Sequence, residues 1–201
     1  MSNVAIKGGL RLYKASSHPQ PLETCIKVVG DSVRVGRGDA VKLVTESATS
    51  ISPGPIVACV ARAAAGDSIY GVVDSVVPVI EGTGAVNLGI TYSPASTAQY
   101  LLIRKANHQD IYTISDDGAA ALTAGDIGQN ANLVVADCDT ASGLSNMKID
   151  ATSVAAGNAT RQLHIVGVVD DATNDPASTG TRWLVTLNNI YGAGGTGTVG
   201  V

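Results

Sequence analysis

Short apolar runs divided by turn-forming residues restrict the fold of this chain more than any other feature. The runs are rich in Val and Ile, whose branched Cβ suits a pleated backbone, and Gly, Pro, Asp and Asn separate them. No segment keeps a 3.6-residue apolar period, and only residues 118–124 could form a helical turn. The pattern predicts an all-β protein, built as barrels or a sandwich. The main predicted strands cover residues 24–29, 40–45, 56–61, 69–79, 88–92, 98–105, 111–114, 132–136, 147–151, 162–169 and 183–187.

One β phrase occurs twice, at residues 69–76 and 165–172. Each copy has a glycine at its third place, which predicts a β-bulge or the close approach of another backbone. Each has an aspartate at its sixth place, which we expect to end the run by accepting hydrogen bonds from backbone amides. Weaker echoes at 38–44 and 125–135 precede the copies. We interpret the repeat as two related β-units in tandem, and chance similarity in a chain rich in Val, Ala and Gly is the alternative.

The predicted organisation has four parts. They are an extended N-terminal arm at 1–20, a first β domain at 21–92, a second β domain at 93–190, and a flexible Gly-rich C-terminal tail at 191–201. Each domain is expected to be a small barrel or sandwich-like unit. We also predict that the strands at 98–105 and 111–114 form a hairpin across a polar tip.

Composition limits the possible partners. Charged residues make up 15% of the 201 residues, against the ~25% of typical soluble domains, and there is no Phe. A core of small apolar side chains buries less area per residue, so we expect a homo-oligomer, a dimer or trimer, or another partner to add stability. The net charge is −4, and the densest basic stretch is only Lys7, Arg11 and Lys14, which predicts a solvated face or a contact to an acidic partner. Nucleic acid is not expected as a partner. Neither is a membrane, because no apolar run nears the ~20 residues of a spanning helix.

Cysteines and histidines give no sign of a disulfide or metal site. The cysteines are odd in number and far apart, and they are expected to be free, buried thiols in a reducing cytosol: Cys25, Cys59 and Cys138. The first residues, Met1 to Val4, lack the charged start of a secretion signal. None of His18, His108 and His164 is spaced as a metal ligand. We expect His164 to be a hydrogen-bonded or half-exposed strand residue and His108 to be solvated.

Acidic pairs at strand ends are the remaining candidates for chemistry. They are Asp116-Asp117, Asp137/Asp139 and Asp170-Asp171. Paired carboxylates can bind Ca²⁺ or act as acid and base, but aspartate is also common at strand ends for turn formation alone. Residues 143–146, Gly-Leu-Ser-Asn, lack the second glycine of a nucleophile elbow. We therefore predict no catalytic, cofactor-binding or metal-binding residues and a protein that is not an enzyme.

Five stretches between residues 66 and 190 carry a resemblance to a known family. They are 66–73, 92–103, 126–132, 163–169 and 182–189, and the Pro-Ala-Ser-Thr-Ala and Trp-Leu-Val phrases within them are the most specific. On these phrases the chain resembles the structural cement (capsid decoration) proteins of tailed bacteriophage heads. The N-terminal third departs from the family pattern, since it lacks an Arg-Pro-containing opening and an aromatic-rich first strand.

The resemblance implies a non-enzymatic β protein that binds the outer surface of a phage capsid and stabilises contacts between major capsid protein subunits. The protein would be made in the bacterial host cytoplasm and located on the virion. The arm and the tail would then reach across subunit boundaries, although ordinary frayed termini are an alternative. Two other functions stay open. A receptor- or carbohydrate-binding module of a phage fibre would be favoured by exposure of Trp183, and a small hydrolase would need converging Asp and His side chains.

Overall fold

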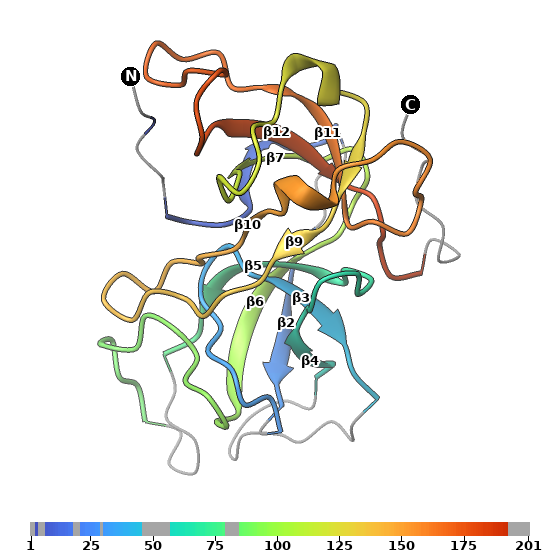
Figure 1. The fold of residues 1–201 in the computed structure, drawn as a ribbon. Coiled ribbons are helices and arrows are strands. Elements are labelled where there is room, and N and C mark those ends of the chain that lie inside the picture. Colours follow the sequence, from blue (N-terminus) through green and yellow to red (C-terminus); the bar gives the residue numbers. More distant parts are fainter. Residues whose placement is uncertain are drawn as a thin grey trace.

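The computed structural model describes residues 3, 7–17, 21–28, 30–45, 57–78 and 85–192. In this part of the chain there are twelve strands and two 3₁₀ turns, so the prediction of an all-β protein is confirmed. Figure 1 shows two lobes stacked one above the other, a barrel below and an open sheet above.

The lower lobe is a closed five-stranded barrel in the order β2-β4-β3-β5-β6. Its strands are β2 (Leu22–Lys27), β3 (Ala40–Leu43), β4 (Cys59–Arg62), β5 (Gly71–Val76) and β6 (Gln99–Lys105). Strands β2 and β4 pair in parallel, and the other neighbours are antiparallel. Closure leaves this lobe without a free sheet edge, which is the usual advantage of a barrel.

The upper lobe is an antiparallel sheet in the order β1-β7-β12-β11-β8. Its strands are β1 (Arg11–Lys14), β7 (Ile111–Ser115), β12 (Arg182–Leu187), β11 (Leu163–Val168) and β8 (Asn130–Ala131). A two-stranded ladder of β9 (Leu133–Val134) and β10 (Lys148–Ile149) lies beside it, with 3₁₀ turns at Ala124–Asp126 and Ala151–Ser153. The helical turn predicted at 118–124 is wrong, because the 3₁₀ turn begins only after Thr123, which caps it.

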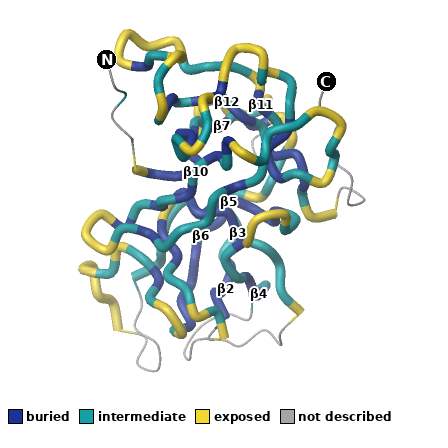
Figure 2. The backbone as a smooth tube through the Cα atoms, in the orientation of Figure 1, coloured by how far each residue is buried: buried dark blue, intermediate teal, exposed yellow. Residues whose placement is uncertain are grey.

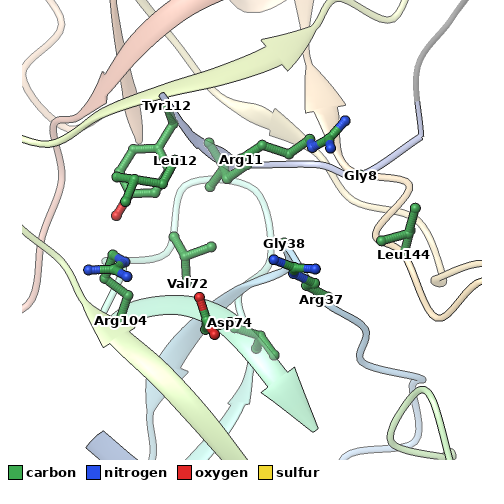
Figure 3. A pocket seen from close by; sticks show the side chains of 12 residues that line it. Gly8, Arg11, Leu12, Arg37, Gly38, Val72, Asp74, Arg104, Tyr112 and Leu144 are labelled. Atoms are coloured by element: carbon green, nitrogen blue, oxygen red, sulfur yellow. The ribbon is translucent and has the colours of Figure 1, made fainter. Parts of the chain in front are cut away.

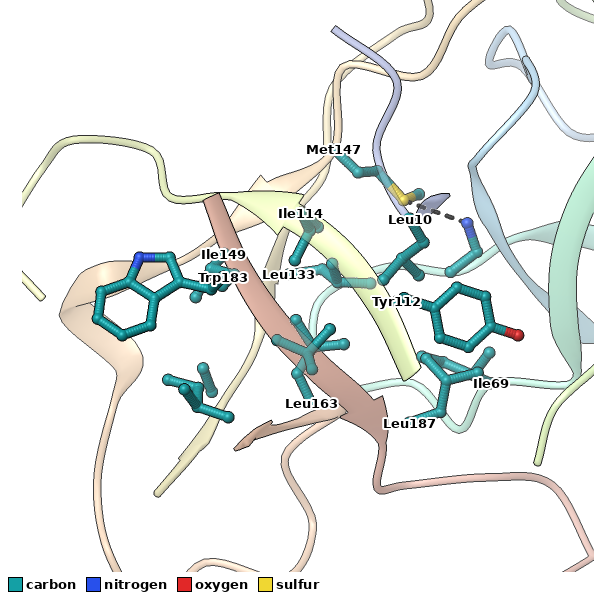
Figure 4. Close-up of a cluster of buried hydrophobic side chains, with 14 of the residues drawn as sticks. Leu10, Ile69, Tyr112, Ile114, Leu133, Met147, Ile149, Leu163, Trp183 and Leu187 are labelled. Atoms are coloured by element: carbon teal, nitrogen blue, oxygen red, sulfur yellow. Dashed lines mark hydrogen bonds between the residues drawn. The ribbon is translucent and has the colours of Figure 1, made fainter. Parts of the chain in front are cut away.

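One hydrophobic cluster spans both lobes, on the outer face of the barrel and the inner face of the upper sheet. Alternation along β5 sends Val73 into the barrel and Val72 outward, toward the sheet of the upper lobe. Val72 and Ile69 join a cluster with Tyr112 and Trp183 of the upper lobe. Figures 2 and 4 show this buried layer continuing between the lobes. This cluster joins the two lobes, while the barrel interior keeps a separate core that includes Val73 and Leu101.

The predicted hairpin of residues 98–105 and 111–114 is wrong. Strand β6 completes the barrel by pairing with β2 and β5, whereas β7 lies between β1 and β12 in the upper sheet. The chain therefore crosses between lobes at residues 106–110, and the division predicted at 92/93 does not follow the sheets. Likewise, β1 of the predicted arm pairs with β7 as part of the upper sheet.

The repeated phrase lies in two different settings. Its first copy is β5 of the barrel, where a Cβ on Gly71 would lie 2.5 Å from the carbonyl oxygen of Arg104. Its second copy is β11 of the open sheet, where the register shifts between Ile165 and Gly167 as in a β-bulge. The predicted close approach of another backbone is thus found at Gly71, and the predicted β-bulge at Gly167. The predicted role of the first aspartate is wrong, because β5 continues past Asp74 to Val76.

Candidate functional site: a cleft between the lobes

Three distant chain segments meet where the barrel joins the upper lobe. The segments are 8–10, 36–39 and 143–147. Backbone hydrogen bonds connect them: Gly8 N donates to the Ser145 carbonyl at 2.9 Å, and Leu10 N donates to the Gly38 carbonyl at 3.0 Å. Ser145 N also donates to the carbonyl of Arg37 at 2.9 Å. We call this crossing the glycine junction.

Glycines allow the close approach at the glycine junction. Gly38 has a φ of +89°, and a Cβ there would lie 2.0 Å from the carbonyl oxygen of Gly8. A Cβ on Gly36 would lie 2.4 Å from the carbonyl oxygen of Gly143. The approach of these three segments was not predicted from the sequence. The feature that could have indicated it is the set of glycines at 8–9, 36, 38 and 143, since glycine allows backbones to approach closely.

A buried aspartate fastens the glycine junction from inside. Asp39 is fully buried, and it accepts a hydrogen bond from the Ser145 hydroxyl and one from Gly36 N at 2.7 Å. Ser145 Oγ in turn accepts from Met147 N at 3.0 Å. The buried hydroxyl of Ser145 is therefore both a donor, to Asp39, and an acceptor, from Met147 N.

Because of Asp39, we predict a contribution to stability that decreases as the pH rises. Burial raises the pKa of its carboxyl group to about 6, against two opposing hydrogen bonds. The folded protein therefore takes up a proton at a higher pH than the unfolded chain does. Stability from this group is fully present below the unfolded pKa and is lost as pH rises through 6.

We expect Asp39→Asn to remove this contribution. At about 1.4 kcal/mol per pKa unit, the wild type should gain up to about 3 kcal/mol relative to the variant between pH 7 and pH 4. Urea unfolding of both proteins across that range measures the difference, and the comparison cancels the opposite contribution of carboxyl groups with a lowered pKa, such as Asp171. Parallel curves for the two proteins would contradict the assignment.

Above the glycine junction lies a cleft of about 320 Å³, which we call the arginine cleft (Figure 3). Strands β1, β5, β6 and β7 and the loop before β3 contribute its walls. The residues that line it are Gly8, Leu10, Arg11, Leu12, Arg37, Gly38, Val72, Val73, Asp74, Arg104, Tyr112 and Leu144.

The arginine cleft carries three guanidinium groups and one carboxylate. Arg11, Arg37 and Arg104 surround it, and Asp74 lies between Arg37 and Arg104 in Figure 3. Within the described part of the chain, none of these four side chains forms an ion pair or hydrogen bond. The cleft therefore has an excess of cationic donors that are not committed elsewhere in the described structure.

Tyr112 adds a buried polar group to the arginine cleft. It is fully enclosed by neighbouring atoms, and its hydroxyl has no hydrogen-bond partner among the described residues. Figure 3 shows the hydroxyl pointing along the cleft wall toward Arg104. Burial, followed by the charge of Asp110, raises the pKa of this hydroxyl, so it is a neutral donor at all ordinary pH values.

The histidines and cysteines lie apart from the arginine cleft. His164 lies in β11, and its Nδ1 is 2.7 Å from Asn130 Oδ1, so it is a hydrogen-bonded strand residue as expected. His108 is an exposed residue whose Nδ1 is 2.8 Å from the carbonyl oxygen of Leu187, and His18 lies outside the described residues. The three cysteines are buried and form no disulfide, as predicted. Burial raises the pKa of Cys25 to about 12 and that of Cys138 to about 11.

The acidic pairs have structural roles. Asp116 is buried and accepts hydrogen bonds from Gly118 N, Gly180 N and Trp183 Nε1 at 3.0, 2.8 and 3.2 Å. Asp171 accepts from Thr173 N at 2.8 Å, as in a turn. In the pair Asp137/Asp139, Asp139 accepts a hydrogen bond from a turn amide, as the prediction of turn formation requires. Asp137 instead forms ion pairs with Arg34 and Arg62.

Among the described residues, no group of three or more His, Cys, Asp or Glu side chains is arranged to hold a metal ion. In the same part of the chain, no helix has the length and apolar character needed to cross a membrane. Comparison of the chain with family models, with curated proteins and with solved structures found no match.

Proposed function

We propose that this protein is a non-enzymatic structural protein of a phage head, which binds the outer surface of the capsid and stabilises contacts between major capsid protein subunits. The observation that carries the proposal is strand β1. All four of its residues are exposed, with 40% of Leu12 and 60% of Tyr13 accessible, and it is the end strand of its sheet. An exposed edge strand can pair with an extended segment of a second chain, and its side chains add specificity.

The charge of this segment supports an acidic partner surface. Arg11 and Lys14 of β1 are exposed, and Lys7 precedes them with most of its side chain in solvent and an ion pair to Asp139. Each copy would contribute a modest contact, and the sum over many copies would stabilise the shell by mass action and multivalency.

Oligomer formation, the chain ends and the sequence repeat complete the proposal. A dimer or trimer on the virion surface would cover the most exposed apolar side chains, Val86 and Leu88, the latter 83% accessible. Residues 8–14 of the predicted arm are held in the fold, so we assign its contact with a neighbouring subunit to the exposed β1, and the tail at 191–201 would supply a second contact. The proposed tandem origin of the two lobes is supported by the glycines of the repeat, which both lie where a strand is bulged or closely approached.

The structure gives no support to a carbohydrate-binding module that uses Trp183 or to a hydrolase that uses the described histidines. Sugar sites usually stack an aromatic ring on the sugar, and Trp183 is the only tryptophan of the chain. Its side chain is fully buried in the shared core, which counts against a carbohydrate-binding module that uses it. A hydrolase would need converging Asp and His side chains, but the hydrogen bonds that Nδ1 of His108 and His164 form in the structure go to Leu187 O and Asn130 Oδ1.

The direct test is binding to expanded phage capsids that lack a decoration protein. We expect the purified protein to cosediment with them at a fixed number per shell and to raise the melting temperature of the shell. Tyr13→Asp should weaken this binding at least about tenfold, because it puts a negative charge on the proposed contact strand.

Ile127→Asp is the matched control, since it puts the same charge on another exposed apolar side chain of the upper lobe, 40% accessible and outside β1. It should retain shell binding. The absence of saturable binding by the wild type would overturn the capsid function, and equal binding by the wild type and the Tyr13→Asp variant would overturn the role of β1.

A further inference from the structure

The arginine cleft has the donor set of an anion site. A guanidinium presents N–H donors in a planar fork that matches the two oxygens of a carboxylate. Arg104 is half-buried beside Tyr112, whereas Arg11 and Arg37 are exposed near the mouth. The Arg11 side chain folds back over Gly8, where a Cβ would lie 2.9 Å from Arg11 Cδ. That placement keeps the guanidinium along the rim of the cleft.

The hydroxyl of Tyr112 is independent evidence for a ligand. Buried polar atoms are nearly always hydrogen-bonded, and the exceptions call for an explanation. This hydroxyl is enclosed, has no partner in the described chain, and points along the cleft wall toward Arg104. An oxyanion held by Arg104 would provide the missing acceptor.

The size and charge of the cleft narrow the class of anion. A volume of about 320 Å³ is at the small end of ligand sites. Asp74 offsets part of the positive charge of the three arginines and disfavours a highly charged polyanion. Leu10, Leu12 and Val72 supply an apolar wall that suits a short methylene chain.

We propose that the arginine cleft binds a carboxylate carried on a short aliphatic chain, with Arg104 Nη and Tyr112 Oη as the inner donors and Arg37 and Arg11 at the mouth. This chemistry is shared by two sources, a free aliphatic dicarboxylate and a glutamate side chain of a protein partner. The site shares Arg11 and Leu12 with the proposed contact strand β1, but its test uses the isolated protein, so its failure is distinguishable from failure of the capsid function.

Calorimetric titration of the full-length protein at low ionic strength tests the proposal with three probes. The probes are glutarate, a blocked glutamate-containing tripeptide and inorganic phosphate. Saturable one-to-one binding of glutarate or of the peptide supports the carboxylate site, and the tighter of the two identifies the source. Failure of both carboxylate probes to bind, or binding of phosphate alone, overturns it.

Variants separate the site from general charge effects. Arg104→Gln should weaken carboxylate binding at least tenfold, while Arg34→Gln, which removes a cation paired with Asp137 outside the cleft, should leave it unchanged. Tyr112→Phe should weaken binding about fivefold without lowering the unfolding midpoint, because the hydroxyl has no protein partner to lose. Unchanged binding in Tyr112→Phe, or equal losses in Arg104→Gln and Arg34→Gln, would overturn the assignment. The Tyr112 variant keeps the test decisive if Arg104→Gln does not fold.

Discussion

Gly38→Ala is expected to destabilise the protein by about 4 kcal/mol. The new methyl group would lie 2.0 Å from the carbonyl oxygen of Gly8, which belongs to backbone and cannot rotate away. The φ of +89° adds the left-handed penalty, about 1–2 kcal/mol, to an overpacking cost of about 1–3 kcal/mol. Urea unfolding followed by circular dichroism measures the loss.

Gly66→Ala is the matched control for this prediction. Gly66 has a similar φ of +83°, but nothing lies within 4 Å of its Cβ position. It should therefore show the conformational penalty alone, about 1 kcal/mol. Equal losses at the two positions would mean that the glycine junction does not hold the lobes in close contact.

Most strands of the fold could be predicted because their signals are local, whereas the strand predicted at 88–92 is wrong: residues 88–89 form a turn there. Alternation in β12 places Trp183, Val185 and Leu187 on the buried face and Arg182 and Thr186 on the more exposed one, as a period of two requires. The β-branched runs of β5 and β11 were evident for the same reason. These properties depend on neighbouring residues within one run.

The pairing of the strands could not be predicted in the same way. Strands β6 and β7 have the sequence of a hairpin, yet β6 matches β2 over the six positions from Leu22 to Lys27. That long-range pairing, and closure of the barrel through β5, outcompetes the local turn. Short connections favour adjacent strands only as a tendency.

The arginine cleft could not be predicted either, because its residues come from distant parts of the sequence. Arg11, Arg37 and Arg104 are far apart in the sequence, and each has an ordinary local context. Only Arg11 belonged to the basic stretch that was noted for a possible acidic partner. The three come together because the glycine junction draws β1 against the loop before β3, beside the outer face of β5 and β6.

Trp183→Ala is expected to lower the free energy of unfolding by about 4 kcal/mol. The indole is fully buried in the core that joins the lobes (Figure 4), and replacing a buried tryptophan by alanine typically costs about 3–5 kcal/mol. The change also removes the Nε1 donor from Asp116, which is itself buried. Since Trp183 is the only tryptophan, circular dichroism must replace intrinsic fluorescence as the probe of unfolding.

Two further variants separate the causes of the stability loss in Trp183→Ala. Trp183→Phe keeps a ring in the core but removes the donor to Asp116 and part of the indole volume, so it should cost about 2 kcal/mol. Leu184→Ala, on the half-buried face of the same strand, should cost about 1 kcal/mol. A loss for Trp183→Ala no greater than that for Leu184→Ala would contradict burial of the indole, and would return a sugar-stacking role to consideration. The predicted order, with Trp183→Ala the most damaging, instead assigns the only tryptophan to the hydrophobic cluster as a structural residue.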